Sequence, residues 1–196
     1  MNQQTDKLQL LHMNWQRLRA DIDSIGTTFD INDLLPSPQE DFEEQEEPYY
    51  LQYPLSLRQQ ATEMARYYRI FYCLENSIRD LVESQLEETA GDEWWEDRVP
   101  AQIKESVKSN INREKDNGVT LRSSHPIAYT TFGELSEIIK SNFEIFGATF
   151  NSQKGLEKVM STLNLLRGPI AHCTPLAEDE VLRLHLAIRS FNRLTA

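Results

Sequence analysis

The chain has 196 residues, of which 39% are hydrophobic and 26% are charged, and its formal net charge is -11. This size and composition are typical of one globular domain with an appendage, and two cysteines are too few for a disulfide framework. No apolar run approaches the roughly 20 residues of a membrane span, and the N-terminus lacks a signal peptide's apolar core, so we expect a cytoplasmic protein without membrane contact.

The acidity is concentrated near the N-terminus. Residues 1–53 hold 3 basic and 11 acidic residues, a net charge of -8, whereas residues 54–196 hold 17 and 20, a net charge of -3. Six acids and three prolines fall within residues 36–48. Such a segment repels itself and buries little apolar surface, so residues 27–53 are predicted to be an acidic linker or docking strip.

An additional N-terminal helix is predicted before this strip. Apolar residues recur there at intervals of three and four, which gives a narrow seam suited to packing on the body or on a second copy. The seam consists of Leu8, Leu11, Trp15, Leu18, Ile22 and Ile25. We therefore divide the chain into residues 1–53, with the helix and the acidic linker, and a folded domain over residues 54–196.

A long helix is predicted from about residue 57 to residue 88. Its apolar stripe is interrupted by one carboxylate, Glu75, and Arg79 lies one helical turn later, where it offers that carboxylate a partner. The stripe consists of Met64, Tyr68, Phe71, Glu75, Ile78 and Val82.

The remaining apolar residues also follow a helical period. Further helices are predicted over residues 100–114, 131–150, 153–166 and from Thr174 to the C-terminus. Thr131 and Thr174 are expected to cap the helices that follow them. Because no segment alternates between apolar and polar residues as a strand would, the fold class predicted is an all-α helical bundle.

The connection between the last two helices contains Arg167 and His172. Gly168 and Pro169 are expected to end the first of these helices, so that a tight turn holds the guanidinium and the imidazole close together. An imidazole can transfer protons at neutral pH, and a guanidinium can stabilise the charge of a phosphorane-like transition state. The spacing also fits an arginine that caps a helix end and a histidine that fills a turn.

RNA is a substrate on which such a pair could act. Its own 2′-OH attacks the neighbouring phosphodiester, so the reaction needs a base and an acid but neither a metal nor a protein nucleophile. A symmetric dimer would supply two histidines and two arginines to one site. No cluster of His, Cys and carboxylates has zinc spacing, so neither a metal nor another cofactor is expected.

Four segments of the chain resemble the HEPN superfamily of all-α ribonuclease domains. The similar subtype occurs in a eukaryotic nuclear mRNA-surveillance endonuclease and in bacterial defence proteins. The segments are RYYRIFYCLENSIRDLV (66–82), WWEDRVP (94–100), HPIAYTTFGELSEIIKSNFEIF (125–146) and LNLLRGPIAHCTPLAEDEV (163–181). The resemblance implies a compact bundle that usually dimerises and, in active members, cleaves RNA without metal at a site formed by both copies.

The resemblance also assigns residues. Arg167 matches the phosphate-stabilising arginine of the Arg-x4–6-His motif, and His172 matches its acid/base histidine. The residue after the arginine is usually polar in the family, often Asn, and here it is Gly168. Some family members are catalytically silent, and this departure keeps that alternative open.

Basic stretches flank this motif in residues 98–122 and 181–196. RNA contacts are predicted for Arg122, His125, Arg183, His185, Arg189 and Arg193. A turn histidine bonded to the backbone and a solvated helix face are the structural alternatives for these residues. Trp94 and Trp95 would stack bases or, as a pair at a helix junction, pack in the core.

Two functions follow from these residues. The first is a metal-independent endoribonuclease in defence or toxin-type RNA degradation, acting as a homodimer on RNA. The second is a non-catalytic HEPN module that senses or binds a partner protein. Residues 1–53 would contact that partner, or would fold over the basic faces and suppress RNA binding until they are displaced.

Overall fold

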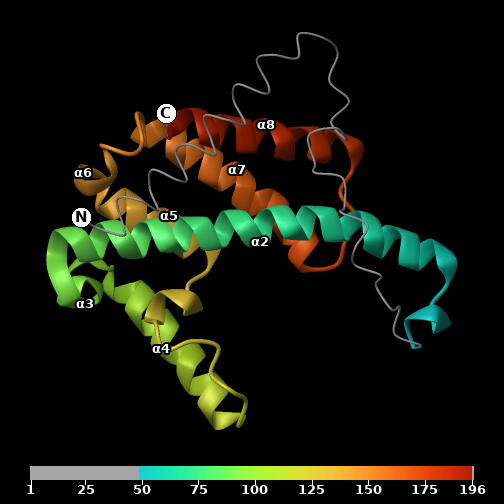
Figure 1. The fold of residues 1–196 in the computed structure, drawn as a ribbon, viewed down its shortest axis with the longest axis horizontal. Helices are drawn as coiled ribbons and strands as arrows, with labels where there is room; N and C mark the ends of the chain where they lie inside the picture. Colours follow the sequence, from blue (N-terminus) through green and yellow to red (C-terminus); the bar gives the residue numbers. More distant parts are fainter. Residues whose placement is uncertain (1–48, 196) are drawn as a thin grey trace, which may run out of the picture. The chain divides into compact units, whose positions relative to one another are not determined.

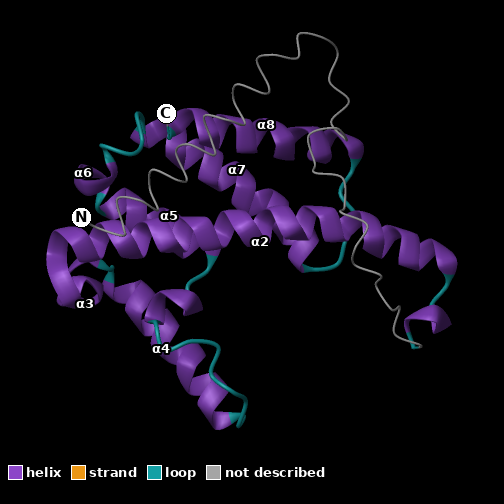
Figure 2. Cartoon of the chain, in the orientation of Figure 1, coloured by secondary structure: helices purple, strands orange, loops and turns teal. Residues whose placement is uncertain are grey.

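The structure is a computed structural model and describes residues 49–195, which belong to one compact unit, residues 48–196. Throughout that described range the chain forms helices and loops and no strand (Figures 1 and 2), which confirms the all-α prediction. None of the described helices combines the length and hydrophobicity of a membrane span. The predicted N-terminal helix and most of the acidic strip lie outside the described residues, and the domain boundary at residue 53 stays a prediction.

Helix α2 (Leu55–Ala90) is the longest of the described helices. Its 36 residues correspond to roughly 54 Å, and a short 3-10 turn, η2 (Tyr50–Gln52), precedes it. Its buried residues are Phe71, Glu75, Ile78, Val82 and Leu86, and Met64 and Tyr67 pack against the same core in partly buried positions. Tyr68, which the periodicity places on the apolar stripe, is 59% exposed instead.

A second layer folds back from the end of α2. Gly91, with a φ of +71°, ends that helix, and η3 (Gly91–Glu93), α3 (Trp94–Arg98) and α4 (Ala101–Asp116) follow. The rings of Trp94 and Trp95 pack edge to face at 5.5 Å, Trp94 buried and Trp95 against the core. The tryptophan pair is therefore part of the core.

The third segment contains η4 (Pro126–Tyr129), α5 (Phe132–Ser141) and α6 (Phe143–Phe146). Thr131 caps α5 as predicted, in a capping box with Glu134. The single helix predicted over residues 131–150 is interrupted at buried Asn142. Its Nδ2 donates to the Arg98 and Ile138 carbonyls at 3.0 and 2.9 Å, and its backbone leaves the helical region at a φ of -123°.

Helices α7 (Gln153–Ala171) and α8 (Glu178–Leu194) pack closely on one another and complete the bundle. The prediction that Gly168 and Pro169 end the helix is wrong, because α7 continues through Pro169 for another half turn. Proline removes one N–H, whose partner would have been the carbonyl of Leu165, a residue that is 74% exposed and open to water.

The end of α7 uses the residues that were expected to begin α8. Cys173 adopts a left-handed φ of +55°, its N–H donates to the Ile170 carbonyl, and the Thr174 N–H donates to the Pro169 carbonyl at 2.8 Å. These bonds form a Schellman motif. Helix α8 therefore starts at Glu178, where the Glu180 carboxylate accepts from the Ala177 N–H at 2.9 Å.

Candidate functional site

A buried carboxylate joins two arginines at the crossing of α2 and α7. Glu75 is only 8% exposed. One of its oxygens accepts from Arg79, and the other accepts from Arg167 Nε at 2.8 Å. Arg79 also donates to the Thr130 carbonyl at 3.1 Å, which ties the network to the start of α5. One buried negative charge thus faces two positive charges, which compensates the cost of burying it and leaves the cluster net positive.

Arg167 is anchored by only part of its guanidinium. Its Nε is used by Glu75, whereas Nη1 and Nη2 have no hydrogen-bond partner within residues 49–195. About a third of the side chain (35%) is exposed. Because Nη1 and Nη2 form one edge of the planar fork, that edge is free to bind an anion such as a phosphate.

His172 lies at the C-terminal cap of α7 and is exposed. Its backbone N–H donates to the Gly168 carbonyl at 3.0 Å, while its ring has no partner among the described residues. Arg167 and His172 therefore share one helix end and do not face each other across an inter-helix turn. Five residues apart, they point about 140° away from each other around the helix axis.

Gly168 follows Arg167, at the position where the resemblance described above leads us to expect a polar side chain. A Cβ built on this residue would meet no atom within 4 Å, and its φ is not left-handed. Neither packing nor backbone geometry therefore requires glycine here. A polar side chain would fit in the open space beside Arg167.

Arg122 and His125, the predicted RNA contacts in the loop after α4, both have intramolecular partners. Arg122 Nε donates to Glu114 at 2.7 Å, and its guanidinium lies 4.9 Å from the centre of the Tyr129 ring. His125 Nδ1 lies 2.7 Å from a carboxylate oxygen of Glu83 on α2. That hydrogen bond, together with the charge of Glu83, raises the pKa of His125. The alternative that this ring bonds to backbone is wrong, since its partner is a side chain.

The predicted basic residues of α8 do not form one face. His185, Arg189 and Arg193 follow one another at intervals of four, but Arg183 lies about 160° from His185 around the helix axis. Arg183 pairs with Asp179 at 3.3 Å, and the His185 ring bonds through Nδ1 to the Val181 carbonyl at 2.8 Å. Arg189 and Arg193 are exposed and, within the part of the chain described, have no ion pair.

The bond between Glu75 and Arg167 was not predicted from the sequence, although the sequence pattern contained an indication of it. Each of the two charged residues interrupts an apolar helical stripe, and two opposite charges on buried stripes are expected to pair. Within residues 49–195, no group of three or more His, Cys, Asp or Glu side chains is placed to hold a metal ion.

The fold is an all-α bundle with an anchored arginine and an exposed histidine at the end of its penultimate helix, the arrangement expected from the resemblance to HEPN domains. The Swt1-like HEPN family matches residues 69–194, which is more than half of the chain. The chain therefore belongs to the Swt1-like HEPN family. HEPN domains are often ribonucleases. No curated protein and no solved structure gives a match.

Proposed function

We propose that this protein is an endoribonuclease that cleaves RNA without a metal ion, through the substrate's own 2′-OH, and that Arg167 and His172 are its catalytic residues. The observation that carries the proposal is the anchoring of Arg167. Glu75 holds its Nε, and its two terminal nitrogens remain available at the helix end that also presents the His172 ring.

The proposed cleavage needs only imidazole groups for its proton transfers and the guanidinium of Arg167 for charge stabilisation. A neutral imidazole takes the proton of the 2′-OH, the 2′-oxygen forms a bond to phosphorus, and the bond from phosphorus to the 5′-oxygen breaks. A second, protonated imidazole gives its proton to the departing 5′-oxygen. The products are a 2′,3′-cyclic phosphate and a 5′-hydroxyl. The Nη groups of Arg167 donate to the non-bridging oxygens, where charge increases in the transition state.

The proposed site requires two copies of the chain. One imidazole is either base or acid in a single step, so the second proton transfer needs another histidine, which a symmetric homodimer provides. Exposed leucines on the last turns of α7 and the first half of α8 support an interface there: Leu165, Leu182 and Leu186.

The biological role proposed is RNA degradation in defence or in a toxin-type system. Induced expression of the wild-type chain in a bacterial host is then expected to arrest growth and degrade cellular RNA. Expression of His172→Ala at the same level is expected to do neither. Equal growth arrest by both proteins would contradict this role.

A second function, a non-catalytic HEPN module that binds a partner protein, is favoured by Gly168. The open space beside this glycine leaves the site without the polar side chain that is usual in the family. Residues 1–53 would supply the partner contact. Absence of RNA cleavage, together with a protein complex that is lost when residues 1–53 are deleted, would favour this function.

The deciding experiment is cleavage of labelled RNA by the full chain in EDTA. We expect fragments that end in 2′,3′-cyclic phosphate, and their loss in His172→Ala and in Arg167→Ala. His185→Ala is the matched control, because the His185 ring is already bonded to its own helix. Equal cleavage by His172→Ala, or a strict requirement for added Mg²⁺, would contradict the proposal.

A further inference from the structure

Two tyrosines stand exposed on α2 among residues that are buried or partly buried. Tyr68 and Tyr72 are each 59% exposed, and as neighbours four residues apart their ring centroids lie 6.1 Å from each other. Large aromatic surfaces left in water on a helix face mark a binding surface more often than they serve the fold. We name this pair the tyrosine platform.

A series of hydrogen bonds connects the backbone of Tyr72 to the candidate site. Asn76 Nδ2 donates to the Tyr72 carbonyl at 2.7 Å, and Asn76 Oδ1 accepts from Arg79 Nη1 at 3.1 Å. Arg79 pairs with Glu75, which holds Arg167. Tyr72 precedes Glu75 by three residues, about 4.5 Å along the helix axis, so the platform begins one turn from the Arg167 anchor.

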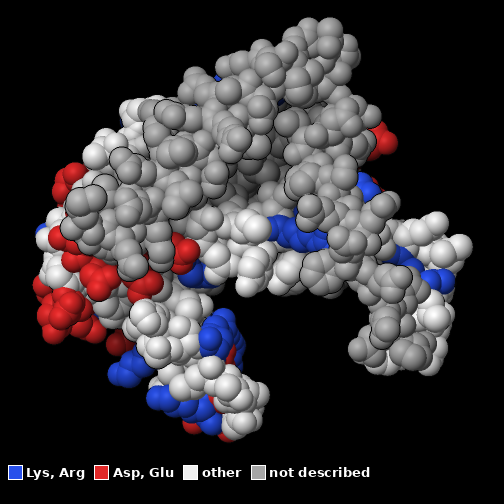
Figure 3. All heavy atoms as spheres, in the orientation of Figure 1, with Lys and Arg blue, Asp and Glu red and all other residues white. Residues whose placement is uncertain are grey.

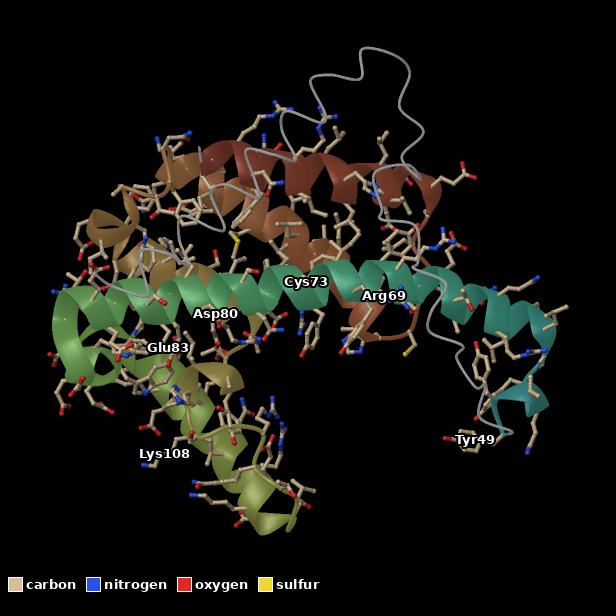
Figure 4. All side chains as sticks on the ribbon, viewed as in Figure 1. Tyr49, Arg69, Cys73, Asp80, Glu83 and Lys108 are labelled. Carbon is tan, nitrogen blue, oxygen red and sulfur yellow. The ribbon has the colours of Figure 1, made fainter. Side chains whose placement is uncertain are left out.

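The segment of α2 that carries the platform has a net positive charge between residues 66 and 79. Residues 66–79 contain three arginines and a single acid, Glu75, which is already bonded to two of the arginines of the site. Arg66 and Arg69 are exposed and have no ion-pair partner in the described part of the chain. Arg69 and Cys73 lie midway along α2 (Figure 4), where the end of α7 crosses this helix (Figure 1). Exposed aromatic rings among unpaired arginines are the surface that binds single-stranded nucleic acid.

The surface formed by α4 also carries basic side chains. Figure 3 shows Lys and Arg side chains on the part of the surface formed by α4. The candidate site lies where α2 and α7 cross. A strand that reached from the candidate site to α4 would have basic groups near its phosphates at both ends.

The ring geometry sets how bases bind. A base inserted between two parallel rings needs a separation of about twice the ~3.4 Å stacking distance, roughly 6.8 Å. The rings are 6.1 Å apart and inclined by 39°, which is too close and too tilted for insertion. Each ring therefore offers its outer face to a different base, and the two bases belong to neighbouring nucleotides.

We infer that Tyr68 and Tyr72 stack two neighbouring bases of single-stranded RNA and so place the adjoining phosphate at Arg167. This inference rests on the proposed function for the identity of that phosphate as the scissile one. Because bases must be unstacked from a duplex to reach the rings, single-stranded RNA is the preferred substrate, with little dependence on base identity.

The experiment measures binding of a fluorescein-labelled 12-nucleotide RNA to the full chain carrying His172→Ala, so that no cleavage occurs. We expect Tyr72→Ala to weaken binding by about 5- to 150-fold, the range measured for loss of one stacked base, and Tyr68→Ala to act similarly. Tyr72→Phe, which keeps the ring, is expected to bind as the unchanged chain does. Tyr53→Ala is the matched control, because this tyrosine is equally exposed but lies before α2.

Each result has a defined meaning. Equal RNA affinity of Tyr72→Ala and Tyr72→Phe overturns the inference. A change in oligomeric mass by light scattering in Tyr72→Ala, without a change in RNA affinity, also overturns it and assigns the surface to a second copy of the chain. Ring-dependent binding without cleavage by the wild-type chain upholds the platform and rejects the ribonuclease proposal, whereas cleavage with ring-independent binding rejects the platform alone.

Discussion

Glu75 accepts a hydrogen bond from Arg167 Nε at 2.8 Å, between residues 92 positions apart in the sequence. The bond joins the core face of α2 to the last turns of α7. It fixes the stem of the guanidinium and leaves its terminal edge exposed. The same contact therefore contributes both to the packing of two helices and to the orientation of the group proposed to bind phosphate.

Replacing Glu75 by Ala is expected to lower the free energy of unfolding by about 3 kcal/mol. The substitution leaves Arg79 and Arg167 without their shared counter-charge, and Arg79 is the more buried of the two. Urea denaturation followed by circular dichroism measures this value. Glu63→Ala, on the exposed part of α2, is the control and should remain within about 0.5 kcal/mol of wild type. If Glu75→Ala lowers the free energy of unfolding by less than about 1 kcal/mol, the ion pairs of Glu75 do not contribute substantially to the packing of α2 on α7.

Replacing Cys173 by Gly is expected to raise stability by about 0.5 kcal/mol. A left-handed residue with a Cβ costs roughly 1–2 kcal/mol, part of which is offset by the greater entropy of glycine in the unfolded chain. Cys73→Gly, in the interior of α2, is the matched control and should lose about 0.5 kcal/mol or more. Thermal unfolding of both variants measures the difference, and a shift of the same sign in both would contradict the Schellman assignment.

Replacing Gly168 by Ala is expected to stabilise the protein by about 0.5–1 kcal/mol, because the residue is helical and its Cβ would meet no neighbour. Gly155→Ala is the contrasting control, because its Cβ would lie 3.0 Å from Leu194 and the substitution should not raise stability.

Substitution of Gly168 also tests catalytic activity. If the missing polar group limits catalysis, Gly168→Asn is expected to cleave RNA faster than wild type, and equal rates would reject that limit.

The pairing of His125 with Glu83 predicts a pH-dependent contribution to stability. The pKa of His125 is raised in the folded state by Glu83, so the contribution is fully present below the unfolded pKa of ~6.5 and is lost as pH rises through the higher folded value. The melting temperatures of wild type and Glu83→Gln should therefore differ at pH 5.5 and converge at alkaline pH. A difference that grows with pH would contradict the sign of this shift.

The sequence predicted most of the fold because helical periodicity is local information. The prediction was wrong or incomplete where a single side chain, or a partner distant in the sequence, determines where a helix ends or how a side chain is held. Asn142 breaks the expected long helix by bonding to Arg98, which no local pattern reveals. Pro169 was expected to end α7, but the helix tolerates it where the lost bond faces water. The residues of the site were named from their motif, whereas the anchoring of Arg167 by Glu75 depends on how α7 crosses α2.

The proposed two-copy site makes a quantitative prediction for mixed dimers. If both imidazoles are needed, as base and as acid, only dimers with two wild-type chains are active. After full exchange of equal amounts of wild type and His172→Ala, the fraction of such dimers is the square of one half, about one quarter of the total. If each copy acted alone, about one half of the activity would remain. Cleavage rates of exchanged mixtures at constant total protein distinguish the two cases. An activity that falls linearly with the wild-type fraction would contradict a site shared between copies, and it would require the second proton transfer to come from a group other than the partner's histidine.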